Sequence, residues 1–248
     1  MVTKRKKNWT REELIVAFNL YCKIPFSKIN YNHQQINELA NAIGRTPSAV
    51  AWKLVNFASL DPSLKQRNIK GAVNIGKLDK IIFEEFYNDW DKLAYESEVE
   101  LSRLFNKELI IEYEIDFSLK EGKVRESLVK LRVNQSFFRN TILASYENKC
   151  CITGINISDL LVASHIIPWS KDEKNRLNPR NGLCLNNFHD KAFDKGYLTI
   201  DENYRIKLSK QIIESKKKEN IQKYLLDIEG KEIDMPKRFL PDTIPLSV

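Results

Sequence analysis

Apolar side chains recur at helical spacing along residues 9–58, which predicts a group of amphipathic helices. The first helix is expected to begin after Thr10, because threonine caps helix N-termini. Glu12 and Glu13 then occupy the first turn, where the helix dipole favours acidic side chains. The predicted buried face of this helix consists of Leu14, Ala17, Phe18 and Tyr21.

Two further helices are predicted on either side of the turn Gly44-Arg45-Thr46. The earlier helix runs from about residue 34 to residue 43 and stops at Gly44. The later helix opens with Thr46 as its cap and Pro47 at its first position, where a missing N–H costs nothing. Its apolar stripe is predicted to consist of Val50, Ala51, Leu54, Val55 and Ala58.

This pair of helices has two interpretations. In a DNA-binding helix-turn-helix, the second helix enters the major groove and nearby basic residues hold phosphates. Arg45 and Lys53 are placed for that role. The alternative is an ordinary helical bundle that contains the same short turn.

A domain boundary is expected near residue 100, where the chain becomes acidic and polar. Residues 78–106 are predicted to continue as helix up to this boundary, and residues 108–115 fit either a strand or a linker. A further helix is predicted over residues 133–147. Its inward side chains are expected to be Phe137, Phe138, Ile142 and Leu143.

After residue 150 the pattern changes to short strands, turns and helices, so the second half of the chain is expected to be mixed α and β. The predicted elements are a strand and turn at 151–156, a strand at 160–167, a loop and extended segment at 178–185, a helix at 187–195, a hairpin of 198–200 with 204–208, and a lysine-rich helix face at 214–223.

Composition narrows the class of partner. The net charge of +7 favours a polyanion such as nucleic acid, although general solubility would also explain it. No apolar run approaches 18 residues, and the basic start of the chain is not followed by an apolar segment, so neither a membrane span nor a secretory signal is expected. The four cysteines form no CxxC pair, which argues against a structural zinc site and a disulfide framework and favours a cytoplasmic location.

Histidine is the scarcest chemical group, and two of the three histidines fall within one short stretch. His165 ends a predicted strand, Asn181 lies in a loop, and His189 lies in a short helix with Asp190 and Asp194. Because imidazole binds metals and changes charge near neutral pH, this order indicates a site that holds a metal and moves a proton. The third histidine, His33, stands apart and is interpreted as a surface or capping residue, with a DNA contact as the alternative.

Four blocks of this region, spanning residues 148–200, resemble the HNH endonuclease family, whose members have a ββα-metal fold and cut DNA phosphodiesters. The blocks are Cys151-Ile-Thr-Gly, Ala163-Ser-His-Ile-Ile-Pro-Trp-Ser, Asn178-Pro-Arg-Asn-Gly-Leu-Cys-Leu and His189-Asp-Lys-Ala-Phe-Asp-Lys-Gly.

The resemblance implies roles for the three site residues. His165 would be the general base that takes a proton from water, Asn181 would orient the loop and the base, and His189 would bind a divalent cation, Mg²⁺ or Mn²⁺ with Ni²⁺ as an alternative. One departure concerns the position before the first histidine, where many relatives carry an acidic ligand and this chain has Ser164. Asp190 and Asp194 are the nearest replacements, with helix capping or ion pairing as the alternative. A second departure is that the CxxC pairs of zinc-stabilised relatives are missing.

Two groups of residues are candidates for DNA contact. Arg176 and Arg180 lie in the loop that carries Asn181, where their guanidinium groups would grip phosphates. The segments that begin at Asn8 and Gly44 are similar to modules joined to HNH domains in bacterial restriction-type proteins. They resemble more weakly the sulfur-binding domain of type IV restriction endonucleases, which recognise phosphorothioate DNA. That resemblance would make Pro47, Val50 and Ala51 the wall of an apolar pocket, with Arg45 holding the backbone.

The sequence therefore predicts an α+β protein with an all-helical DNA-recognition domain at residues 1–100 and an HNH domain at residues 101–248. The expected function is metal-dependent cleavage of double-stranded DNA for restriction or defence, with modified DNA as the candidate target. A homodimer is compatible with cutting both strands. The alternatives are a non-catalytic DNA-binding protein with a degenerate HNH scaffold, which Ser164 favours, and a nuclease that acts on RNA or on a particular nucleic-acid structure.

Overall fold

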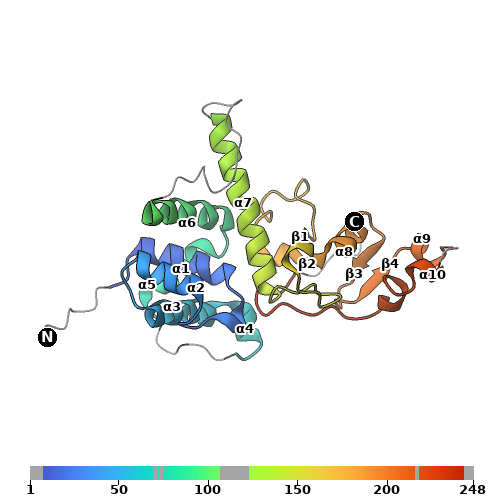
Figure 1. The fold of residues 1–248 in the computed structure, drawn as a ribbon, viewed down its shortest axis with the longest axis horizontal. Helices are drawn as coiled ribbons and strands as arrows, with labels where there is room; N and C mark the ends of the chain where they lie inside the picture. The colour runs from blue at the N-terminus through green and yellow to red at the C-terminus, as the bar shows by residue number, and fades with distance from the viewer. Residues whose placement is uncertain (1–7, 70–71, 73–74, 107–122, 216–217, 243–248) are drawn as a thin grey trace. The chain divides into compact units, whose positions relative to one another are not determined.

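The computed structural model describes residues 8–69, 72, 75–106, 123–215 and 218–242, and the expected strand or linker at 108–115 lies outside them. The chain divides into two compact units (Figure 1). The first unit comprises Met1–Ile24 and Lys28–Phe137, and the second comprises Pro25–Ser27 and Phe138–Val248. Helices predominate and the strands form small antiparallel sheets, so the fold is α+β.

The described part of the first unit contains helices and turns. Its helices are α1 (Arg11–Lys23), the 3₁₀ turn η1 (Phe26–Lys28, shared with the second unit), α2 (Gln34–Ala42), α3 (Pro47–Leu60), α4 (Pro62–Gln66), α5 (Lys77–Phe86), α6 (Trp90–Phe105) and the first part of α7 (Lys123–Ser145).

The starts of these helices follow from the expected capping residues. Thr10 caps α1 and forms a capping box with Glu13, and Thr46 caps α3 by accepting a hydrogen bond from the Ala49 amide. Gly44 adopts a φ of +65°, a left-handed conformation that glycine tolerates, and so turns the chain between α2 and α3. The three predicted helices of this region are therefore confirmed.

One helix prediction was wrong. The continuous helix expected over residues 78–106 is two helices, because α5 ends at Phe86 and α6 begins at Trp90. Asp89 caps the second of them, and its side chain accepts a hydrogen bond from the Lys92 amide. A capping carboxylate inside an apolar periodic segment ends one helix and starts the next.

The core of the first unit is a cluster of aromatic rings around Phe18 of α1. This ring lies 4.8 Å from Phe57 and 5.3 Å from Phe83, measured between centroids, and 6.2 Å from Trp90. Phe18 and Phe57 are completely buried. Packing of large rings from α1, α3, α5 and α6 therefore holds the bundle together.

The second unit mixes short strands and helices. Its elements are the end of α7, η3 (Ser158–Leu160), β1 (Leu161–His165), η4 (Pro179–Asn181), β2 (Gly182–Asn186), α8 (Asn187–Asp194), β3 (Leu198–Ile200), β4 (Ile206–Leu208), α9 (Lys210–Ile213), α10 (Lys218–Ile221) and η5 (Leu226–Ile228).

Comparison with the expected elements gives three corrections in this unit. Residues 151–156 contain a turn but no strand, and the helix predicted over 133–147 already begins at Lys123. The lysine-rich segment 214–223 contains the short helix α10, and α9 ends just before this segment at Ile213. The strand around residues 161–165, the helix after Asn186 and the hairpin of β3 with β4 are confirmed.

Strands β1 and β2 pair antiparallel, and His165 at the end of β1 stands opposite Gly182 at the start of β2. The end of α7 packs against this point. A Cβ atom on Gly182 would lie 2.2 Å from Ile142 Cδ1 and 2.9 Å from Phe138 Cζ, so a side chain there would collide with the helix. Glycine is therefore needed for the close approach of α7 to the strand pair.

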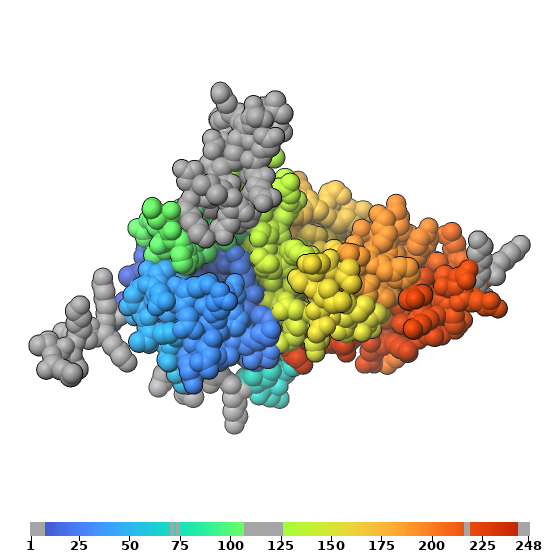
Figure 2. Space-filling model, viewed as in Figure 1, coloured from blue at the N-terminus to red at the C-terminus, as the bar shows by residue number. Residues whose placement is uncertain are grey.

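Main-chain hydrogen bonds tie the last described residues to the rest of this unit. Gly230 donates to the Ile206 carbonyl at 2.8 Å, and Asp234 donates to the Cys151 carbonyl at 2.7 Å. In Figure 2 the orange and red residues of the second unit form one continuous body on the visible face. Within the described residues, no helix is long and apolar enough to cross a membrane.

We expect Gly182→Ala to lower the free energy of unfolding by about 1–3 kcal/mol, because the added methyl group overpacks the contact with α7. The φ of −139° at Gly182 is accessible to alanine, so the cost is steric. Urea unfolding measures the change. Adding Ile142→Val removes the Cδ1 atom and should restore part of the loss; equal instability of the single and double variants would contradict the steric explanation.

Candidate functional site

His165 is held at the end of β1 by two rings and one carbonyl. Its ring stacks on Phe138 with centroids 3.9 Å apart and an interplanar angle of 6°, and the Trp169 ring meets it edge-on at 5.7 Å. His165 Nε2 lies 2.9 Å from the Arg176 carbonyl oxygen. A carbonyl can only accept, so Nε2 carries a proton and Nδ1 of the neutral ring bears the lone pair.

The surroundings of His165 favour its neutral form. Burial lowers the pKa of His165 below its usual value of 6.5, while the hydrogen bond to Arg176 and the Asp194 carboxylate act in the opposite direction. A neutral imidazole with a defined tautomer and a lone pair on Nδ1 is the form that can accept a proton from water.

The Asn181 side chain fastens the loop that follows His165. Its Oδ1 accepts a hydrogen bond from the Ile167 amide at 2.8 Å, and its Nδ2 donates to the Ile167 carbonyl at 3.1 Å and to the Asn175 carbonyl at 3.2 Å. The residue is 4% exposed. All these partners belong to the protein backbone, so the Asn181 amide fixes the loop around His165.

Two carboxylates of α8 lie on the side of this helix that faces β1. Burial raises the pKa of Asp190, the nearby Ser164 hydroxyl acts in the opposite direction, and the Asp194 carboxylate raises this pKa further. The Ser164 Oγ atom is buried and makes no well-aligned hydrogen bond. Ser164, Asp190 and Asp194 thus place hard oxygen atoms near His165, although no three His, Cys, Asp or Glu side chains of the described residues converge as a metal-ligand group.

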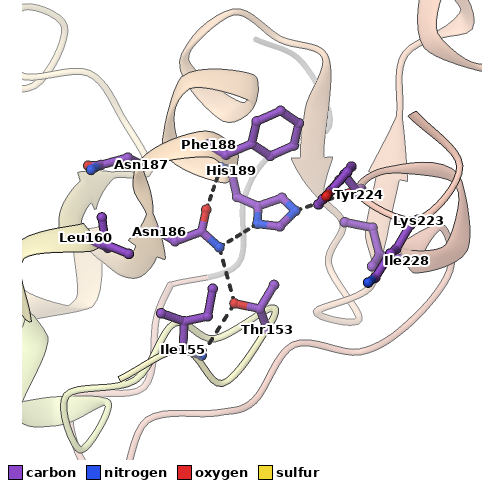
Figure 3. A pocket seen from close by; sticks show the side chains of 10 residues that line it. All are labelled: Thr153, Ile155, Leu160, Asn186, Asn187, Phe188, His189, Lys223, Tyr224 and Ile228. Atoms are coloured by element: carbon purple, nitrogen blue, oxygen red, sulfur yellow. Dashed lines mark hydrogen bonds between the residues drawn. The ribbon is translucent and has the colours of Figure 1, made fainter. Parts of the chain in front are cut away.

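His189 belongs to a different environment. Asn186 Nδ2 lies 2.9 Å from its Nδ1, and the Tyr224 carbonyl oxygen lies 3.0 Å from its Nε2, so both ring nitrogens have partners (Figure 3). Its ring lies beside Phe188 in the wall of a cavity of about 560 Å³. Because both ring nitrogens are engaged in these hydrogen bonds, neither is free to bind a metal in this conformation, and the metal-ligand role of His189 stays a prediction.

The two arginines of the Asn181 loop differ in how they are held. Arg176 is tied within its loop, since it donates to the Trp169 carbonyl at 3.0 Å and pairs with Glu173 at 2.8 Å. The Arg180 side chain is 48% exposed and pairs with the equally exposed Asp242. Arg180 is therefore the more accessible of the two guanidinium groups.

In the first unit, both cations expected to contact DNA are engaged inside the bundle. Arg45 pairs with Glu13 at 2.6 Å, and Lys53 is 9% exposed and pairs with Asp79 at 2.8 Å. The Trp9 ring lies under both, 4.1 Å from the Arg45 guanidinium and 5.0 Å from the Lys53 ammonium. These contacts favour a structural role for the two cations.

The expected pocket residues of α3 are also partly enclosed. Val50 is completely buried, and Pro47 and Ala51 are half-buried. The outward face of α3 instead presents Ser48 and Trp52, and Trp52 is 63% exposed. Sequence reasoning missed this tryptophan, although its position between the buried residues of α3 places it on the outer face.

The second unit thus combines a strand pair with a histidine at its edge, a loop held by an asparagine, and a following helix with two carboxylates. Residues 150–201 match the family model described as HNH endonuclease, which confirms the expected resemblance over this segment. The family is one of nucleases, so the match indicates a nuclease domain in this segment. A search of curated proteins finds no match to the chain.

We expect Arg45→Ala to lower the free energy of unfolding of the first unit by about 1–3 kcal/mol, because it removes a charged hydrogen bond to Glu13 and the contact with Trp9. Urea unfolding followed by tryptophan fluorescence measures the change. The matched control is Lys65→Ala, an exposed cation on α4. Equal stability of the two variants would show that Arg45 is available for another role.

Proposed function

We propose that the chain is a metal-dependent DNA endonuclease in which His165 is the general base and Asp190 and Asp194 hold a divalent cation. The observation that carries the proposal is the hydrogen bond between His165 Nε2 and the Arg176 carbonyl, since it leaves the lone pair of the neutral ring on Nδ1. The match of residues 150–201 to HNH endonucleases supports the same reaction.

Each residue contributes to hydrolysis of the phosphodiester. His165 Nδ1 accepts a proton from the attacking water, and Phe138 and Trp169 hold the imidazole in place. Asn181 keeps the loop after β1 closed around the base. Arg180, together with Arg176 four residues earlier in the same loop, contacts the phosphate backbone.

The residues near His165 fit a hard cation. Two carboxylates and a buried hydroxyl at Ser164 are oxygen donors of the kind that Mg²⁺ and Mn²⁺ accept, and Mg²⁺ is commonly held by only one or two carboxylates together with water and phosphate oxygens. When bound, the cation would offset charge on the phosphate and on the leaving oxygen. This donor set supports a metal site in a chain that has Ser164 in place of an acid.

For the first unit we propose DNA recognition through the outward face of α3 rather than through Arg45 and Lys53. Trp52 offers a large exposed ring, and Ser48 offers an exposed hydroxyl group on the same helix. We also propose that the target is modified DNA, with phosphorothioate DNA as one candidate, and that a homodimer cuts both strands. The domain boundary near residue 100 and the cytoplasmic location remain predictions from the sequence.

A second candidate function is DNA binding without catalysis. It is favoured by the serine at position 164 and by the absence, within the described residues, of a ligand group with three converging side chains. Cleavage assays separate the two functions.

We expect wild-type protein to cleave plasmid DNA with Mg²⁺, Mn²⁺ or Ni²⁺, and His165→Ala to lower the rate by about 10²–10⁴-fold because the proton acceptor is lost. Asp190→Asn should raise the concentration of metal that gives half-maximal rate. Asp159→Asn, which changes an exposed carboxylate of the same unit, is the control. Failure of the wild type on modified and plain DNA, and on RNA, would leave only the binding function.

The cleavage rate should rise with pH and level off, with a midpoint below 6.5, because only neutral His165 accepts a proton and burial lowers its pKa. A pH profile of single-turnover cleavage at saturating metal measures the midpoint. A midpoint at or above 6.5 would mean that another group is the base or that His165 is exposed in the active state.

A further inference from the structure

One buried carboxamide joins three separate segments of the second unit. Asn186 Oδ1 accepts a hydrogen bond from the His189 amide at 3.0 Å, which caps α8. Asn186 Nδ2 faces His189 Nδ1 at 2.9 Å, Thr153 Oγ1 at 3.2 Å and Cys150 Sγ at 3.6 Å (Figure 3 draws all of these except Cys150). These four side chains, Cys150, Thr153, Asn186 and His189, are called the clasp below.

The loop that supplies half of the clasp is itself closed. The Cys150 amide donates to the Ile155 carbonyl at 2.8 Å, and the Gly154 amide donates to the Cys150 carbonyl at 2.8 Å. Gly154 adopts a φ of +70°, which permits this tight turn. The Cys151 amide donates to the Cys184 carbonyl at 2.8 Å, so the loop is also fixed to β2.

The spacing within the clasp is informative. Cys150 and Thr153 are separated by two residues in a tight turn, and Asn186 and His189 are separated by two residues at the start of a helix. Two such pairs, one from a turn and one from a helix N-terminus, are an arrangement that brings four ligands around a tetrahedral zinc ion. Only one of these four positions carries a thiol and only one carries an imidazole, and hydrogen bonds from Asn186 connect it to the other three side chains.

We propose that the clasp is a hydrogen-bonded equivalent of a tetrahedral metal site, and that Asn186 is a positioning residue that fixes the first turn of α8 and thereby Asp190 and Asp194. The imidazole of His189 is a member of this clasp, and its Nε2–H is held by the Tyr224 carbonyl. The catalytic consequence rests on the proposed nuclease function, whereas the geometry of the clasp does not.

The first test separates the clasp from simple helix capping. Asn186→Asp keeps an oxygen that can cap α8 but removes the amide donors, while Asn186→Ala removes both. If the clasp positions the carboxylates, both variants should lower kcat for DNA cleavage by about 10–100-fold with little change in KM. Asn187→Ala, at the exposed next position, is the matched control. A wild-type kcat for Asn186→Asp would reduce Asn186 to a cap and overturn the positioning role.

The second test needs no nuclease activity. In the full chain, the double variant Thr153→Cys, Asn186→Cys offers three thiolates and one imidazole to a metal. We expect it to bind one Zn²⁺ per chain, to give the absorption of tetrahedral thiolate coordination with Co²⁺, and to melt at a higher temperature with zinc than without. The matched control is Thr153→Cys, Asn187→Cys, which moves one thiol out of the clasp.

The second test shows whether the four clasp positions surround a single centre. Stoichiometric zinc binding by the clasp variant alone supports four positions around one centre, even if the wild type cuts no DNA. Absence of zinc binding in a variant whose circular dichroism matches the wild type would overturn the proposed geometry, as would equal zinc binding by the control variant.

Discussion

The candidate site depends on one steric constraint, the missing side chain at Gly182. Because this residue has no Cβ, α7 approaches the strand pair closely enough for Phe138 to stack on the His165 ring. Burial in turn lowers the pKa of His165 and so favours the neutral imidazole, and the Arg176 carbonyl selects which nitrogen holds the proton. Close packing of one helix against two strands thus orients the proposed base and favours its neutral form.

Several elements were predictable because their signals are local. Capping residues Thr10 and Thr46 and the turn at Gly44 mark helix ends, and the strand ending at His165 and the helix starting after Asn186 follow from short apolar patterns. The break between α5 and α6 was missed because the apolar periodicity continues across Asp89.

Which of the site residues lie together was harder to predict, because it depends on the side of α8 that each residue occupies. Adjacent helical positions differ in direction by about 100°, so His189 turns toward Asn186 while Asp190 lies near Ser164. A motif gives the order of these residues but not their tertiary partners. Arg45 and Lys53 are a second example. Their charge predicted contacts with DNA phosphates, but in the structure they contact Glu13, Asp79 and Trp9.

Helix α7 belongs to both units, since the division falls between Phe137 and Phe138. The family match begins only at Cys150, yet Phe138 and Ile142 precede it and Tyr224 follows it. In evolutionary exchange between proteins, a gene fragment encoding only residues 150–201 would arrive without the ring that orients His165 and the carbonyl that holds His189. A fragment that kept these contacts would therefore have to start within α7 and extend past Tyr224, well beyond the matched segment.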